Sequence, residues 1–157
     1  MSFSFSDENI TKIEKLKERY PSPKALTLPL LWMVQEQEGY ISLEAMEVIA
    51  THTTRPTMEI YKTATFYTMF KLQPIGKYHI QLCKTLSCML CGKKEILEQI
   101  KSTLDIEVGE TTKDGRFTLS QVECLGSCST APMMQINSDN YENLTSQKIE
   151  QILKELS

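Results

Sequence analysis

The stretch ECLGSCSTAPMMQIN, residues 123–137, places Cys124 and Cys128 four positions apart, ahead of a proline and a short apolar run. Residues 117–122 just before it alternate between apolar and polar side chains and predict a strand. The run after the proline, residues 133–136, predicts another. The two cysteines therefore lie in a short loop at the end of a strand, which holds their sulfur atoms near one point.

A second pair of cysteines is placed in the same way further upstream. Residues 78–82 alternate as a strand that ends at Cys83, and the four residues KTLS lead to Cys88 at the predicted start of a helix. One apolar face predicts a helix over residues 94–104, and another helix ends the chain. The order strand, helix, strand, strand, helix predicts a thioredoxin-like α/β unit, with both cysteine pairs at the same end of its sheet.

The first half of the chain is predicted to be helical. Its apolar spacing and end signals predict helices over residues 7–20, 24–38, 42–51 and 57–71. The methionines of this half are expected to fill its core; they are Met33, Met46, Met58 and Met69. We therefore expect an α+β fold, with an N-terminal helical bundle extension in residues 1–75 and the thioredoxin-like unit in residues 76–157.

Composition excludes several classes of function. A net charge of −3 without a block of Lys or Arg argues against nucleic acid and anionic membrane surfaces as partners. The longest apolar stretch, residues 28–34, is too short to cross a bilayer, so no membrane insertion is expected. The N-terminus lacks the features of a secretion signal or transit peptide, and we expect a cytoplasmic protein.

Five cysteines between residues 83 and 128 favour metal or redox chemistry, because structural disulfides are rare in a reducing cytosol. Four thiolates converging from two loops can ligate either a tetrahedral zinc ion or a 2Fe-2S cluster, and spacing alone leaves both open. Burial as small apolar side chains explains a single cysteine better than two short-range pairs.

Cys91 adds two further alternatives. Together with Cys83 and Cys88 it spells C-x4-C-x2-C, the spacing of plant-type ferredoxins, although bulky apolar residues fill that loop. Cys88 and Cys91 also form a C-x-x-C dithiol motif, with Pro132 before a strand as its companion, as in a dithiol oxidoreductase. A Rieske-type site is excluded, because neither histidine is paired with the cysteines.

Four stretches together resemble the thioredoxin-like 2Fe-2S component, of the 24-kDa or E type, of NADH:quinone oxidoreductase, respiratory complex I. They are CKTLSCMLCG (83–92), ECLGSCSTAPMMQIN (123–137), LPLLWMVQEQEGYIS (28–42) and ATFYTMF (64–70). The resemblance covers roughly residues 10–155. It implies a thioredoxin-like 2Fe-2S ferredoxin domain whose cluster ligands are Cys83, Cys88, Cys124 and Cys128, with Cys91 not a ligand.

The resemblance also implies a function. The cluster would exchange single electrons with FMN in a partner flavoprotein subunit, which binds both FMN and NADH. The chain would then be a cytoplasmic subunit, peripheral to the inner membrane, of an NADH dehydrogenase (quinone) that acts as a redox-driven translocase. Because the sequence has no G-x-G-x-x-G loop, we expect no NADH or FMN binding and no turnover by the isolated chain.

Other assignments stay open from the sequence. Similar subunits serve NAD-linked hydrogenases and formate dehydrogenases, and the rivals of a different class are a zinc-stabilised adaptor and a dithiol oxidoreductase. The cysteine loops also carry hydroxyl groups that could donate to sulfur or cap a turn, at Thr85, Ser87, Ser127, Ser129 and Thr130. We expect Ser127 or Ser129 to tune a cluster potential, with turn capping as the ordinary alternative.

Overall fold

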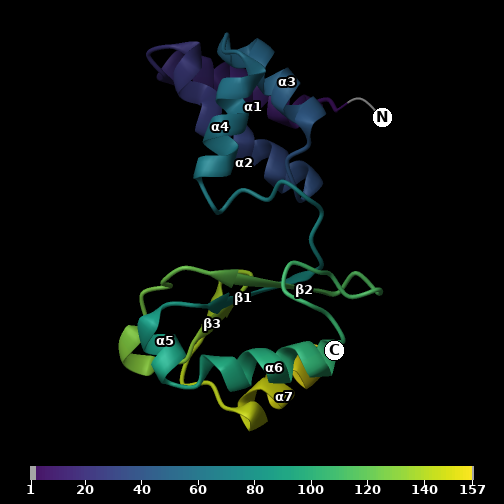
Figure 1. The fold of residues 1–157 in the computed structure, drawn as a ribbon. Coiled ribbons are helices and arrows are strands. Elements are labelled where there is room, and N and C mark those ends of the chain that lie inside the picture. Colours follow the sequence, from purple (N-terminus) through teal and green to yellow (C-terminus); the bar gives the residue numbers. More distant parts are fainter. Residues whose placement is uncertain (1–2, 157) are drawn as a thin grey trace. The chain divides into compact units, whose positions relative to one another are not determined.

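The chain forms two compact units, Met1–Pro74 and Ile75–Ser157 (Figure 1). The structure is a computed structural model that describes residues 3–156. Each unit has a hydrophobic core of its own. The α+β fold class predicted from the sequence is confirmed, with helices in the first unit and a four-stranded sheet in the second.

Within residues 3–74, the first unit consists of four α-helices and one 3-10 turn. They are α1 (Asp7–Arg19), η1 (Pro23–Leu26), α2 (Thr27–Glu38), α3 (Leu43–Thr53) and α4 (Thr57–Phe66). The hydroxyls of Ser6 and Ser42 cap α1 and α3 by accepting from the backbone N–H of Asn9 and Ala45. Gly39, with φ of 81°, ends α2 in the left-handed conformation that glycine adopts without strain.

The last helix of this unit is shorter than predicted, ending at Phe66 instead of residue 71. The backbone N–H of Lys71 donates to the side-chain oxygen of Gln35 at 2.7 Å, and its carbonyl accepts from Ile41 N–H at 2.7 Å. Phe70 is buried against the ring of Trp32, 5.4 Å between centroids. These long-range contacts take the place of the hydrogen bonds that would have continued the helix.

The core of the first unit is built mainly from aliphatic side chains. Its fully buried members include Ile13, Leu30, Leu31, Met46, Ile49 and Ile60. Met46 fills the core and Met33 packs against it as predicted, but Met58 and Met69 are exposed, which corrects the expectation for those two. Met58 lies about 200° around α4 from Ile60, so only one of the two can face the core.

The second unit is a four-stranded sheet covered by helices. Its elements are β1 (Tyr78–Cys83), α5 (Leu86–Leu90), α6 (Lys93–Leu104), β2 (Phe117–Val122), η2 (Cys128–Thr130), β3 (Met134–Ile136), β4 (Asp139–Tyr141) and α7 (Ser146–Glu155). The strand order is β2-β1-β3-β4, with β1 parallel to β2 and the other pairs antiparallel. Figure 1 shows α6 and α7 side by side on one face of this sheet.

The sheet has one apolar and one polar face. Ile80 pairs with Ile136 and Leu82 with Met134, and all four side chains are buried. Gln81 lies between them and points to the other face, because side chains alternate along a strand. The apolar face packs against α6 and α7 and forms the core of the second unit.

Three elements of this unit were not predicted: α5, β4 and the short 3-10 turn η2. A separate short helix, α5, precedes α6, so that Cys88 lies within α5 and not at a helix start. Residues 139 and 140 belong to strand β4. The turn before it lies at residues 137 and 138, where Asn137 adopts φ of 54°, a conformation that asparagine tolerates and that a two-residue hairpin needs.

Candidate metal centre

Cys83 and Cys88 form the buried side of the site. Cys83 ends β1 and Cys88 lies in α5, and each is only 1% exposed. They pack with the buried side chain of Met133 in a small cluster that is separate from the main core. Buried side chains therefore exclude water from this side of the site.

Cys124 and Cys128 form the exposed side of the site. They follow β2, and their sulfur atoms lie 3.4 Å apart. Between them, Gly126 adopts φ of 91°, which favours glycine. Its backbone N–H donates to Cys124 Sγ at 3.4 Å. The loop between the two cysteines thus turns a backbone donor toward sulfur.

Strand topology brings the two pairs together. Because β1 and β2 are parallel neighbours and Cys83 pairs with Val122, the loops that follow both strands begin at the same edge of the sheet. Cys83 and Cys88 pack together against Met133, and the sulfur atoms of Cys124 and Cys128 lie 3.4 Å apart. The two cysteine pairs that the sequence singled out therefore follow neighbouring strands at one edge of the sheet.

The acidity of the thiols differs within each pair. Burial raises the pKa of Cys88, whereas at Cys83 the same effect of burial is outweighed by hydrogen bonds, chiefly from Thr85, which lower the pKa. The Gly126 N–H lowers the pKa of Cys124, and the hydrogen bond and charge of Cys124 raise that of Cys128. Two adjacent thiolates repel each other, so four thiolates at this site call for bound cations.

The donor set fits a binuclear cluster. The thiols form two pairs: Cys83 and Cys88 pack together, and the sulfur atoms of Cys124 and Cys128 lie 3.4 Å apart. A 2Fe-2S cluster uses four cysteine thiolates across two iron atoms, which is the donor set found here.

Cys91 lies apart from this group. It follows the last residue of α5, its side chain is exposed, and its backbone N–H donates to Ser87 at 3.0 Å. In the described part of the chain, no interaction joins its sulfur to the other four. The plant-type ligand set and the Cys88–Cys91 dithiol both require the sulfur atoms of Cys88 and Cys91 to act together. Cys88 is buried whereas Cys91 is exposed, so this arrangement favours neither alternative.

The hydroxyl groups of the two loops divide between sulfur and other partners. Thr85 Oγ1 lies 3.2 Å from Cys83 Sγ. The Thr130 hydroxyl instead donates to the Ser127 carbonyl at 3.2 Å, and the hydroxyls of Ser127 and Thr130 lower the pKa of Glu142. A hydrogen bond thus joins sulfur to Thr85, one of the five hydroxyl residues that the sequence offered, while tuning of the potential by Ser127 or Ser129 stays a prediction. The sequence feature that could have singled out Thr85 is its position two residues after Cys83, in the turn between β1 and α5.

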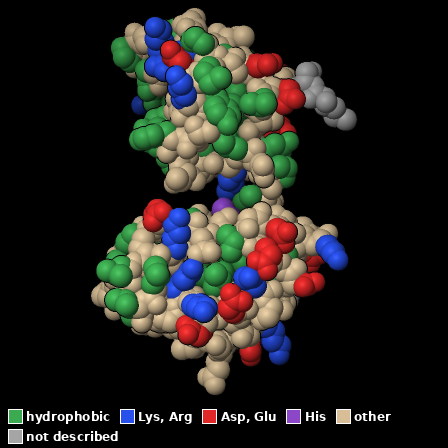
Figure 2. Space-filling view, in the orientation of Figure 1, with side chains coloured by type: hydrophobic (Ala, Val, Ile, Leu, Met, Phe, Trp, Pro, Cys, Tyr) green, Lys and Arg blue, Asp and Glu red, His purple; other side chains and the backbone are tan. Residues whose placement is uncertain are grey.

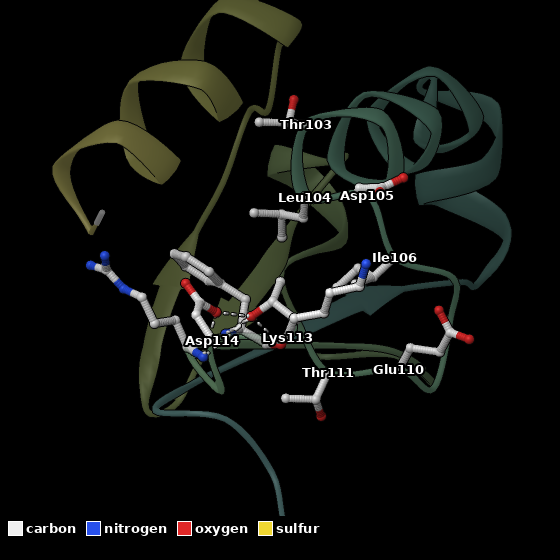
Figure 3. Close-up of a pocket in the computed structure, with 11 residues that line it drawn as sticks. Thr103, Leu104, Asp105, Ile106, Glu110, Thr111, Lys113 and Asp114 are labelled. Carbon is white, nitrogen blue, oxygen red and sulfur yellow. Dashed lines mark hydrogen bonds between the residues drawn. The ribbon is translucent and has the colours of Figure 1, made fainter.

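A hollow of about 690 Å³ in the second unit lies away from the cysteines (Figure 3). It is lined by the end of α6 and residues 105–117. Its wall is tied together internally, since Asp114 accepts from Thr112 Oγ1 and Arg116 N–H, and the Arg116 guanidinium donates to the Leu156 carbonyl at 2.6 Å. None of its lining residues belongs to the thiol site.

No helix within the described residues is both long and apolar enough to cross a membrane.

Comparison with known proteins first defines the class. A parallel strand pair continued by an antiparallel hairpin, with two helices on one face, is the fold of a thioredoxin-like ferredoxin domain. Residues 13–157 match the family of thioredoxin-like [2Fe-2S] ferredoxins, and the chain belongs to that family. The resemblance found in the sequence is confirmed.

Particular relatives narrow this further. The chain is 42% identical to the E-type subunit of the NADH-quinone oxidoreductase of Rickettsia felis, covering 99% of this chain and 95% of the relative. It is 48% identical to the mitochondrial NADH dehydrogenase [ubiquinone] flavoprotein 2 of Dictyostelium discoideum, covering 92% of this chain and 60% of that protein.

A solved structure shares the fold. An NAD+-reducing [NiFe]-hydrogenase in the H2-reduced state aligns with a TM-score of 0.70 at 23% identity, over 81% of this chain and 22% of the hydrogenase chain.

Proposed function

We propose that the chain is the electron-transfer subunit of an NADH:quinone oxidoreductase and holds one 2Fe-2S cluster through Cys83, Cys88, Cys124 and Cys128. The observation that carries the proposal is the meeting of two cysteine pairs at the ends of neighbouring parallel strands. The identity to the Rickettsia relative over nearly the whole chain supports the parent complex. The cluster domain is residues 76–157, and residues 1–75 form a helical domain.

The residues of the site have distinct tasks in this proposal. When bound, the cluster supplies one-electron chemistry. Cys83 and Cys88, packed against Met133, keep water from one side of the site. Cys124 and Cys128 lie at the surface, where a redox partner can approach. The N–H of Gly126 stabilises negative charge on sulfur.

The proposed partner is a flavoprotein subunit that binds FMN and NADH. Three large apolar side chains on α5, next to the thiol site, are exposed: Leu86, Met89 and Leu90. Figure 2 shows hydrophobic side chains gathered at the end of the second unit where α5 lies. Apolar surface of this kind marks contact sites in subunits of larger complexes. The assembly would be cytoplasmic and peripheral to the inner membrane.

The test is metal analysis combined with reconstitution. The purified chain should contain iron and acid-labile sulfide in equal amounts, show a red-brown absorption spectrum and oxidise no NADH. After addition of the flavoprotein subunit, NADH should reduce the cluster, which EPR detects. A colourless zinc protein, or a metal-free dithiol protein, would overturn the cluster assignment. If only the subunits of a hydrogenase or a formate dehydrogenase reduce the cluster, the chain would be assigned to that complex instead.

A further inference from the structure

Thr85 stands at a helix N-cap but does not cap the helix with its hydroxyl group. It is the N-cap residue of α5, with the extended backbone (φ −84°, ψ 172°) typical of that position, yet its side chain makes no capping hydrogen bond. At the other threonine N-cap of the second unit, Thr145 accepts from Lys148 N–H at 3.2 Å. The hydroxyl of Thr85 is therefore free of the role that its position would ordinarily give it.

The hydroxyl is directed at sulfur instead. Thr85 Oγ1 lies 3.2 Å from Cys83 Sγ, and the side chain of Thr85 is half-buried. A thiolate that ligates iron carries no hydrogen atom, so in the loaded protein Thr85 can only be the donor.

We propose that Thr85 is a positioning residue that donates its hydroxyl hydrogen to the sulfur of Cys83 and stabilises the reduced cluster. The inference rests on the proposed function. Reduction adds negative charge that spreads onto the ligating sulfurs, and a hydrogen bond to a charged acceptor gains strength with that charge. Partial burial strengthens the effect, because water cannot replace the lost donor freely.

The test is a redox titration of Thr85→Val, followed by EPR, on the full-length protein. Valine keeps the β-branched shape and removes only the hydroxyl. At a fixed ambient potential, the ratio of reduced to oxidised cluster should fall about threefold, which is ~30 mV for a one-electron couple at 59 mV per tenfold. Thr85→Ser, which restores the hydroxyl, should return the midpoint to that of the unchanged protein.

A matched control comes from the second cysteine loop. The Thr130 hydroxyl donates to the Ser127 carbonyl at 3.2 Å. Thr130→Val should therefore leave the midpoint unchanged. Iron and sulfide content are measured in every variant, because a purely structural role would lower cluster content without moving the potential of the clusters that remain.

The outcomes separate the two proposals. If the protein without any substitution contains no cluster, the proposed function is overturned. A loaded Thr85→Val with an unmoved midpoint, or a shift of equal size in Thr130→Val, overturns the role of Thr85 alone. If valine prevents loading, Thr85→Ala is titrated instead with the same expected fall. Loss of the cluster in both variants while Thr85→Ser loads normally would make Thr85 a folding residue and overturn the inference.

Discussion

At the scale of single residues, a side chain's task in this protein depends on its neighbours more than on its type. Cys83 and Cys88 are buried, Cys124 and Cys128 are exposed, and Cys91 is exposed outside the group. The five cysteines look alike in the sequence, but the pKa values of the four grouped thiols differ in the structure, because burial and hydrogen bonding set the acidity of each.

Replacement of the four grouped cysteines should separate ligands from bystanders. Cys124→Ala should abolish or severely reduce the cluster, since an open position exposes iron to water, and the same holds for the other three. Cys91→Ala is the matched control and should keep full iron and sulfide content. Absorption spectra and metal analysis check this. A bleached Cys91→Ala beside a loaded Cys124→Ala would favour the plant-type ligand set.

His52 should make the helical unit sensitive to pH. Burial lowers its pKa, the charge of Lys17 lowers it further and Glu14 opposes them, while the ring packs edge-on against Phe5. A lowered folded pKa means that the unfolded chain binds the proton first. The free energy of unfolding is therefore highest above the unfolded value of about 6.5 and falls as pH drops below it.

Denaturant titrations between about pH 7 and pH 5.5 measure this slope, a window chosen above the range in which carboxylates titrate. His52→Gln should flatten it in this window. An equal slope in the variant would show that other groups carry the pH dependence.

At the scale of elements, local signals set where helices begin, and distant contacts set where some of them end. Ser6 and Ser42 cap α1 and α3. The predicted end of α4 was wrong because Gln35, on a different helix, takes the N–H of Lys71. No pattern within α4 itself contains that contact.

The caps offer a direct test of this division. Ser42→Ala removes an acceptor for the Ala45 N–H, 3.1 Å away, and should lower the free energy of unfolding by about 1 kcal/mol. Ser22→Ala is the matched control: Ser22 precedes η1 without a side-chain capping bond, so its change should stay within about 0.5 kcal/mol. Chemical denaturation followed by circular dichroism compares them. Equal losses would contradict the assignment of the cap.

At the scale of the whole molecule, the two units have separate cores. The buried cluster around Ile13, Leu30 and Met46 lies entirely within residues 1–74, and the cluster around Ile80 and Leu119 lies within residues 75–157. All four grouped cysteines belong to the second unit. A domain with its own core can in principle fold alone.

We therefore predict that residues 75–157, expressed alone, fold and take up a 2Fe-2S cluster. Far-UV circular dichroism and iron and sulfide content measure this, with the full-length protein as the control. The cluster spectrum should match that of the full chain, because no described residue of 3–74 is among the grouped thiols or their hydroxyl partners. A truncated chain that folds without loading would show that the helical unit completes the site.

The sequence by itself determined what depends on local patterns. Alternation placed β1 and β2, helical spacing placed α6 and α7, and the position of each cysteine pair after a strand put both pairs at one edge of the sheet. Only the tertiary structure decided that α4 stops at Phe66 and that one cysteine pair is buried. Each of these depends on residues far apart in the chain, such as Gln35 with Lys71, whose proximity arises from packing and has no periodic signature in the sequence.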